Sequence, residues 1–205
     1  MRAPAKLYFA SSNPGKLTEF RALAESYANG EHASVSVELL PRFDSLPAFE
    51  ENASTFGENA LGKALYYSQL SDEILFADDS GLAVDVLGGV PGVQSARYAG
   101  PHATSAERIA KLLAELRGKP EAERAAHFSC VIAVIRNGLP VAIVSNRVDG
   151  IILETSRGDG GFGYDPVFYL PALGKTFAEL SAAEKNQHSH RGKAFRRVLA
   201  LLDTF

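Results

Sequence analysis

The chain has 205 residues, of which 46% are apolar and 22% charged, and a formal net charge of −3. This composition excludes a disordered or collagen-like chain and fits a single globular domain, which we expect to span residues 1–205. The weak negative charge supplies no basic field, so we expect no nucleic-acid partner. Neither a signal peptide nor an apolar run of the ~18 residues needed by a membrane helix is visible. We therefore expect a cytoplasmic protein with no membrane partner.

Strand and helix patterns alternate along the first half of the chain. Asn13 followed by Pro14 is typical of a helix start, and so are the capping boxes that begin at Thr55 and Thr104. Apolar runs without helical spacing predict strands between these helices. The expected strands cover 6–10, 35–40, 74–77 and 82–87, and the expected helices run from Pro14 to Asn29-Gly30, from Thr55 to about Leu70 and from Thr104 to Gly118.

The second half predicts an antiparallel pair and two more helices. Asn137-Gly138 separates apolar runs over 127–136 and 140–148, which is a strong hairpin signal. The mixture of helices with parallel and antiparallel strands indicates an α/β fold with a mixed sheet. The remaining expected elements are strands at 151–154 and 167–169, a short helix after Ser181, and a last helix over 190–202 with Ala194, Val198, Leu201 and Leu202 facing inward.

A polar segment lies between the first strand and the first helix. Backbone N–H groups at a helix N-terminus attract phosphate, Gly15 permits close approach, and Lys16 adds a positive charge. It is not a Walker A loop, since Ala10 and Leu17 stand where that motif has glycine and Ser/Thr. Phosphate binding and an ordinary capped turn both remain open for this segment, Ser11-Ser12-Asn13-Pro14-Gly15-Lys16.

Two adjacent acids, Asp78 and Asp79, follow the predicted strand over 74–77 and precede Ser80-Gly81. The end of a strand in an α/β sheet is where ligands commonly bind. Adjacent carboxylates there can hold Mg²⁺ or activate water, because hard cations prefer oxygen ligands. Glu50 and Glu51 could complete such a site from the preceding loop, and a solvated turn is the alternative.

Two further segments carry more polar and glycine content than packing requires. The run Gly158–Pro166 formally matches G-x-G-x-x-G, but Tyr-Asp-Pro cannot open the helix which that motif needs. A glycine loop presenting Phe162 and Tyr164 suits the edge of a flat aromatic ligand, unless these rings fill the core. The basic run from Glu184 to Lys193 could bind phosphate or a base, or could be a solvated helix start.

Together these segments resemble one family. SSNPGKLTEF, FADDSGLAVDVLGGVPGVQSARYAG, GGFGYDPVF and EKNQHSHRGKA resemble signature segments of the inosine triphosphate pyrophosphatase family, also called XTP/dITP diphosphatases. The resemblance implies an elongated mixed sheet flanked by helices, two lobes around a deep nucleotide-binding cleft, and a homodimer. It also implies Mg²⁺-dependent hydrolysis of aberrant purine nucleoside triphosphates (ITP, dITP, XTP) to the monophosphate and pyrophosphate.

The resemblance assigns roles residue by residue. Ser11 to Lys16 would hold the triphosphate, and Lys63 would add a second phosphate contact. Glu51 and Asp79 would serve the metal, with Asp79 as the base or the group that positions water. The nucleoside would be surrounded by Ser80, Phe162, Gly163, Tyr164, Asp165, Lys185, His190 and Arg191.

The residue types are consistent with this reaction. Lysines and amide donors supply the counter-charge that a triphosphate needs. A donor such as Arg191, or a backbone amide, would accept a 6-oxo purine and reject adenine. Two alternatives remain: a Maf-like pyrophosphatase for modified pyrimidine nucleotides, against which GFGYDP and SHR argue, and a nucleotide sensor without catalysis. A pure binder gains nothing from adjacent carboxylates facing a polyanion, which argues against the sensor.

Overall fold

A computed structural model describes residues 5–28, 35–71 and 73–203 of the chain. Its strands form a seven-stranded mixed sheet in the order β2-β1-β3-β4-β5-β6-β7. The chain divides into two compact units, the first made of 1–79, 130–146 and 191–205 and the second of 80–129 and 147–190. The α/β class with a mixed sheet is thus confirmed, while the nucleotide cleft stays a prediction.

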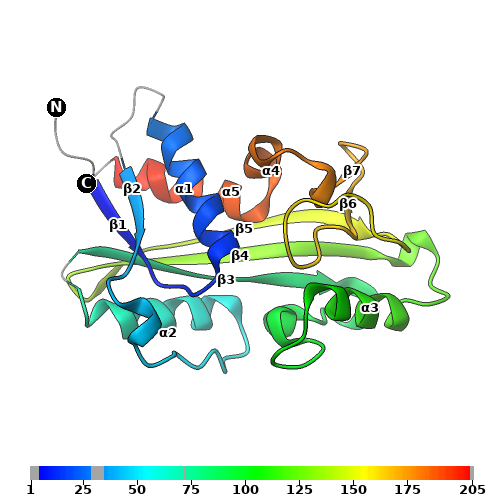
Figure 1. Ribbon diagram of the computed structural model, residues 1–205, viewed down its shortest axis with the longest axis horizontal. Helices are drawn as coiled ribbons and strands as arrows, with labels where there is room; N and C mark the ends of the chain where they lie inside the picture. The colour runs from blue at the N-terminus through cyan, green and yellow to red at the C-terminus, as the bar shows by residue number, and fades with distance from the viewer. Residues whose placement is uncertain (1–4, 29–34, 72, 204–205) are drawn as a thin grey trace. The chain divides into compact units, whose positions relative to one another are not determined.

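The first unit packs helices on both faces of its part of the sheet. β1 (Ala5–Phe9) pairs in parallel with β2 (Val35–Leu39) and with β3 (Ile74–Val84). α1 (Pro14–Ala28) and α5 (His190–Leu202) cover one face, where the rings of Phe9, Phe20, Phe76 and Phe195 meet. α2 (Phe56–Ser68) covers the other face, as Figure 1 shows.

The second unit has its own core. α3 (Ser105–Glu115) packs through Ile109 and Leu112 against strand residues such as Phe128. β6 (Phe168–Leu170) pairs antiparallel with β5 and with β7 (Lys175–Thr176), and α4 (Ala182–His188) follows. Burial of these apolar surfaces is the main source of stability in both cores.

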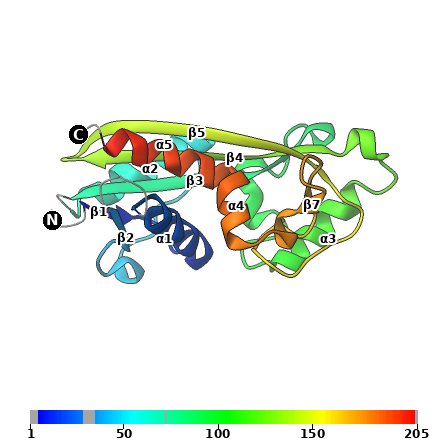
Figure 2. The ribbon, with the colours of Figure 1, turned by 90° about the horizontal axis from the view of Figure 1, so that it is seen from above.

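Local signals set most element boundaries correctly. The side-chain oxygens of Thr55, Thr104 and Ser181 accept the backbone N–H three residues later, so all three predicted caps are confirmed. Asn137 and Gly138 have φ angles of 52° and 73°, as a tight hairpin turn requires, and they join β4 (Ala125–Arg136) to β5 (Leu139–Ile152). In Figure 2, α5 runs alongside β5, and Arg197 donates a hydrogen bond to the Ser145 carbonyl.

Three predictions of elements are wrong. The predicted strands 74–77 and 82–87 are joined in one strand, β3, which passes through Asp78 and Asp79 and ends at Val84, and Asp85–Leu87 is a 3-10 helix. No separate strand covers 151–154, since β5 continues to Ile152 and pairs there with β6. Leu201 is exposed, and Phe195 and Leu199 are buried on α5 in addition to Ala194 and Val198. The predicted helix end at Asn29-Gly30 lies outside the described residues.

Candidate active site

A buried ion pair joins the phosphate segment to the acidic strand. The Nζ atom of Lys16, on the first turn of α1, lies 2.8 Å from Oδ2 of Asp78, whose side chain is 0% exposed. Burial raises the pKa of Asp78, but the nearby positive charges of Lys16, Lys63 and Arg191 outweigh burial and hold it below its ordinary value. Asp78 is therefore an anion inside β3, and its partners explain why the strand does not turn at this point.

Asp79 points to the α2 side and has a different environment. Its Oδ2 accepts a hydrogen bond of 2.9 Å from Nδ2 of Asn59, and its side chain is 6% exposed. Burial and the negative charge of Glu51 raise the pKa of Asp79 to about 6, although Lys16, Asn59 and Lys63 pull it down. Two neighbouring acids thus have pKa values shifted in opposite directions, which is typical of acid–base sites.

Lys63 and Glu51 form a second pair beside Asp79. The Lys63 ammonium is bonded to the Glu51 carboxylate, and the Lys63 side chain is 9% exposed. Burial lowers the pKa of Lys63, but the charges of Asp78 and Glu51 raise it by more. Lys63 is therefore a cation in a cluster that already holds several acids. The structure brings Lys16, Lys63, Glu51 and Asp79 together, as the sequence predicts, whereas Glu50 is exposed and bonds Asn52.

Arg191 lies near the same group of charged residues, because Glu19 and Asp78 both act on its charge. Its Nε donates to Oε2 of Glu19 at 2.5 Å, and its side chain is 6% exposed. Burial lowers the pKa of Arg191, but Glu19 and Asp78 raise it further, so it is always charged. The resemblance places Arg191 against the nucleoside, and that role stays a prediction. In this structure its charge stabilises Asp78. Glu19 was not among the predicted site residues, although its spacing of three from Lys16 puts both on one side of α1.

The rest of the phosphate segment forms the predicted helix start. Oδ1 of Asn13 accepts the backbone N–H of Lys16 at 3.1 Å, and Oγ of Ser11 accepts the N–H of Asn13 at 3.2 Å. Ser11 is buried, Ser12 and Pro14 are exposed, and Gly15 is partly exposed. The segment is an ordinary cap in its hydrogen bonds, and the buried end of Lys16 is what distinguishes it from a simple turn.

The second unit contains another buried ion pair, under an aromatic ring. Nζ of Lys185, on α4, lies 2.6 Å from Oδ2 of Asp165 and 4.6 Å from the ring centroid of Phe162. The same Asp165 oxygen accepts the backbone N–H of Phe162 at 2.7 Å. Lys185 is 5% and Asp165 2% exposed, and Phe162 is partly exposed. The structure brings these three predicted residues together; Gly163 adjoins them in the loop.

Glycines allow this loop to pack closely on its neighbours. A Cβ atom on Gly161 would lie 2.1 Å from Oδ2 of Asp165, and its φ of +71° also favours glycine. A Cβ on Gly158 would lie 2.7 Å from the Ala178 carbonyl, and the Gly160 N–H donates to that carbonyl at 3.1 Å. The loop is therefore fixed by its backbone contacts.

Two of the predicted nucleoside residues have buried side chains. Tyr164 is 4% exposed, its hydroxyl donates to the Ser95 carbonyl at 3.0 Å, and burial raises its pKa. His190 is 0% exposed and its ring stacks on Phe128 with centroids 4.6 Å apart. Both rings are covered by protein in this structure, and the prediction that these residues surround a nucleoside stays a prediction. Ser80 is partly buried.

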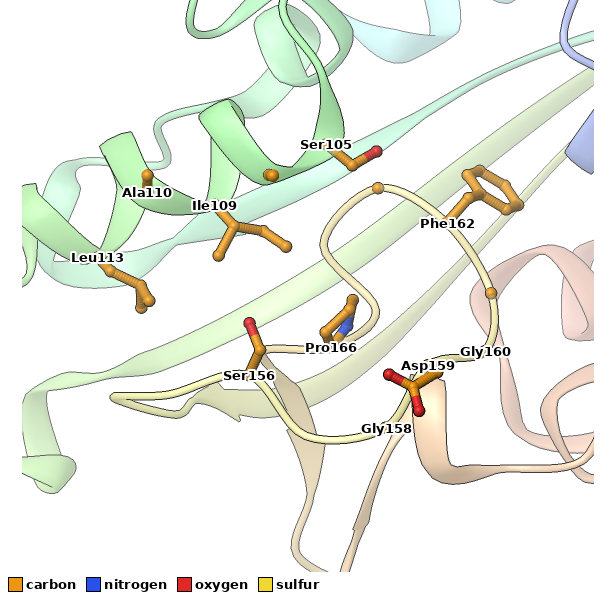
Figure 3. A pocket seen from close by; sticks show the side chains of 13 residues that line it. Ser105, Ile109, Ala110, Leu113, Ser156, Gly158, Asp159, Gly160, Phe162 and Pro166 are labelled. Atoms are coloured by element: carbon orange, nitrogen blue, oxygen red, sulfur yellow. The ribbon is translucent and has the colours of Figure 1, made fainter.

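A pocket of about 580 Å³ adjoins the glycine loop within the second unit. Figure 3 shows Ile109 and Leu113 projecting from α3 on one side and the loop from Ser156 to Pro166 on the other. Phe162, from the same loop, also lines the pocket (Figure 3), and Nζ of Lys185 lies 4.6 Å from the centroid of its ring. The pocket offers aliphatic side chains and glycine backbone, which suit a flat ligand with few charges.

The donor set fits a hard cation that arrives with phosphate. Among the described residues, no group of three or more His, Cys, Asp or Glu side chains is arranged to hold a metal ion. Glu51 and Asp79 are oxygen donors close enough for the Glu51 charge to act on Asp79. Mg²⁺ is commonly bound by one or two carboxylates together with substrate phosphates, so two carboxylates meet its needs.

Relatives of this chain share nearly its whole length. The model of the Ham1 family matches residues 7–201. The chain belongs to the Ham1 family. A protein from Geobacillus kaustophilus named dITP/XTP pyrophosphatase is 50% identical over 193 residues, which cover 94% of this chain and 92% of that one. Another protein of this name, from Gloeobacter violaceus, is 46% identical over 95% of this chain and 92% of its own.

Solved structures agree with this membership. The structure of a HAM1 protein from Coxiella burnetii is 39% identical, covers 98% of this chain and 100% of its own, and has a TM-score of 0.84. The Ham1 protein of Staphylococcus aureus is 36% identical with a TM-score of 0.82, over 97% of this chain and 98% of its own. The resemblance seen in the sequence is therefore confirmed. Among the described residues of this Ham1 family chain, no helix is long and apolar enough to cross a membrane.

Proposed function

We propose that this protein hydrolyses non-canonical purine nucleoside triphosphates such as dITP and XTP to the monophosphate and pyrophosphate. Its relatives are named dITP/XTP pyrophosphatases. The observation that carries the proposal is the buried cluster of Lys16, Asp78, Asp79 and Lys63 in the first unit. Two lysines suit a polyphosphate, and an acid with a pKa of about 6 suits proton transfer near neutral pH.

The reaction adds one water across the bond between the α and β phosphates. The water oxygen bonds to the α phosphorus, pyrophosphate leaves with the bridging oxygen, and a proton of the water passes to Asp79. Above pH 6 Asp79 is largely ionised and can accept it. Lys16 and Lys63 would bind the phosphate oxygens, in the substrate and in the leaving pyrophosphate alike. Asp78, kept anionic by Lys16 and Arg191, would hold the Lys16 ammonium in place.

Mg²⁺ belongs to this proposal as the cofactor. Glu51 and Asp79 would hold it, because they are the oxygen donors next to the two lysines. When bound, the ion would supply positive charge that offsets the negative charge of the phosphates. The protein's part is to keep both carboxylates ionised and correctly oriented.

We propose that the base is recognised by Phe162, Asp165 and Lys185 in the second unit. Phe162 offers a partly exposed ring, and Lys185 offers an ammonium with three donors and no acceptor. A donor facing position 6 of a purine favours a 6-oxo group and leaves the 6-amino group of adenine unpaired, which can cost up to about 10⁴-fold in specificity. We further propose, on the family resemblance, that the protein acts in the cytoplasm as a homodimer.

The test is a substrate panel. ITP, XTP, dUTP and ATP are each incubated with the protein and Mg²⁺, and pyrophosphate and orthophosphate are quantified separately. The proposal expects pyrophosphate from ITP and XTP, with kcat/KM at least about 100-fold above that for ATP. Preference for dUTP would favour the pyrimidine pyrophosphatase, and tight binding without turnover would favour the sensor. Substituting EDTA for Mg²⁺ should abolish turnover.

A further inference from the structure

Asn59 is a buried polar residue on α2 that the proposed reaction does not use directly. Asn59 is only 1% exposed, and its side-chain amide makes three hydrogen bonds. Nδ2 donates to Oδ2 of Asp79 at 2.9 Å and to the Ala53 carbonyl at 3.5 Å, and Oδ1 accepts the backbone N–H of Ala53 at 3.0 Å. One side chain thus connects the acidic strand β3 to the loop that carries Glu51.

The hydrogen-bond network fixes the orientation of this amide. A backbone N–H can only donate, so the Asn59 oxygen must face Ala53. The Asn59 nitrogen must then face Asp79, where it donates to the carboxylate and holds one oxygen in a defined position. Rotating the amide by half a turn would place its oxygen against the Asp79 oxygen and its NH₂ group against the Ala53 N–H. Both contacts are repulsive, and they cost free energy in a buried site.

Asn59 also lies one helical turn before Lys63, the residue that bonds Glu51. Asn59 and Lys63 are four residues apart, so they lie on the same side of the helix. Lys63 bonds Glu51, and Asn59 bonds both Asp79 and the backbone two residues after Glu51. Two like charges repel, so Glu51 and Asp79 need fixed partners to stay near each other. One turn of α2 supplies both partners.

We propose that Asn59 is a positioning residue, which holds the Asp79 carboxylate in the orientation that the hydrolysis requires. The inference rests on the proposed function, because it acts through Asp79. Residues that orient a ligand or base in this way typically change activity by about 10–100-fold when they are replaced. Asn59 touches neither substrate nor water in this scheme, and its effect should vanish when Asp79 no longer acts.

Two substitutions separate the bonds that Nδ2 donates from the bond that Oδ1 accepts. In Asn59→Asp the side chain keeps its shape and an oxygen for the Ala53 N–H, but an oxygen replaces the nitrogen that donates to Asp79 and to the Ala53 carbonyl. In Asn59→Ala all three bonds are lost. Hydrogen exchange of the Ala53 amide reports the loop bond, and we expect protection to persist in Asn59→Asp and to fall in Asn59→Ala. Asn52→Asp and Asn52→Ala are matched controls, since Asn52 is exposed in the same loop and should leave activity unchanged.

The kinetic expectation is a split between kcat and KM. For ITP, kcat should fall by about 10–100-fold in Asn59→Asp, and KM should stay within about threefold because Lys16 and Lys63 still bind phosphate. The loss should be absent in an Asp79→Asn background, where adding Asn59→Ala should change the residual kcat by less than about twofold. A merely structural role would instead lower Tm and cut the activity of both backgrounds in proportion to the unfolded fraction.

The outcomes are distinguishable. A folded Asn59→Asp with kcat within about twofold of the wild type overturns the positioning role. If that variant does not fold, the same criterion applies to Asn59→Ala and to the cycle with Asp79→Asn, and an undiminished loss in the Asp79→Asn background also overturns it. Failure of the wild type to release pyrophosphate from any nucleotide is the different result that removes the proposed function itself.

Discussion

Each of the two units buries a lysine–aspartate pair, and the two pairs have different surroundings. Lys16–Asp78 spans 2.8 Å and its side chains are 13% and 0% exposed, whereas Lys185–Asp165 spans 2.6 Å and its side chains are 6% and 3% exposed. Around Asp78 act two more cations, Lys63 and Arg191. Around Lys185 lie the rings of Phe162 and Phe177.

The two pairs have similar lengths, so the residues around each pair, cations in one case and aromatic rings in the other, determine the role that the pair is suited to. In the first unit Lys63 and Arg191 add to the positive charge of Lys16 around Asp78, so in the proposed reaction Asp78 keeps charged partners when Lys16 also binds a phosphate. In the second unit the pair holds a glycine loop and an aromatic ring in place, because Asp165 also accepts the Phe162 N–H. The first pair is suited to binding a charged ligand and the second to shaping a surface.

The largest expected effect comes from replacing the lysine of each pair in turn, which tests whether the two pairs differ. Lys185→Met keeps the volume but strands the Asp165 carboxylate in a buried site, and we expect a loss of about 3–5 kcal/mol in the free energy of unfolding. Lys16→Met leaves Asp78 near Lys63 and Arg191, so its loss should be about half of that or less. Urea unfolding of both variants measures the difference. Equal losses would contradict the distinction between the pairs.

A smaller free-energy effect is expected on substrate binding, and here we expect it at Lys16. Lys16→Met should raise KM for ITP by roughly 10–150-fold, the equivalent of about 1.5–3 kcal/mol for a lost charge-assisted contact. The kcat value should change much less, because a phosphate contact acts in ground and transition states alike. Steady-state kinetics over a wide ITP range gives both values, and exposed Lys6→Met serves as the control for loss of a lysine. An unchanged KM would remove Lys16 from the phosphate site.

The smallest expected effect is a shift along the pH axis. Burial and the Glu51 charge raise the pKa of Asp79 to about 6, so kcat/KM should fall as pH drops through that value and the carboxylate becomes protonated. Glu51→Gln removes the charge that helps to raise this pKa, so the acidic limb should move to lower pH by up to about one unit. A limb that stays in place would show that burial alone sets the pKa of Asp79.

The sequence predicted what local chemistry controls. Capping residues such as Thr104 and Ser181 and the turn Asn137-Gly138 act within four residues, so their patterns indicated element starts and the hairpin correctly. The continuity of β3 could not be predicted in this way. Asp78-Asp79-Ser80-Gly81 is typical of a turn, and the strand persists because Lys16 and Asn59, distant in sequence, bind the two acids.

Site prediction had a similar limit. The predicted lysines and acids of the first cluster do meet, but the ring positions of Tyr164 and His190 depend on tertiary packing that no local pattern reports. Asn59 has one signal in the sequence. It lies with Lys63 and Ser68 among Ala60, Ala64 and Tyr67 on the buried side of α2, where a buried amide needs a partner.

The most direct test of the central claim is Asp79→Asn, measured for kcat and for Tm. If Asp79 accepts the proton of the attacking water, kcat for ITP should fall by at least about 100-fold. The pKa of Asp79 is about 6 in the folded protein and near 4 in the unfolded chain. Ionised Asp79 therefore lowers the free energy of unfolding as pH rises above 4, by at most about 3 kcal/mol once pH exceeds 6. Without metal, Tm of the variant at pH 8 should therefore equal or exceed that of the wild type, and the advantage should vanish below pH 4.

Both readouts together decide the matter. Low kcat with an unchanged or raised Tm is the result the account predicts. Near-normal kcat at saturating Mg²⁺ would contradict it and move the catalytic role to Asp78, and a Tm lower by many degrees would show that Asp79 stabilises the fold instead.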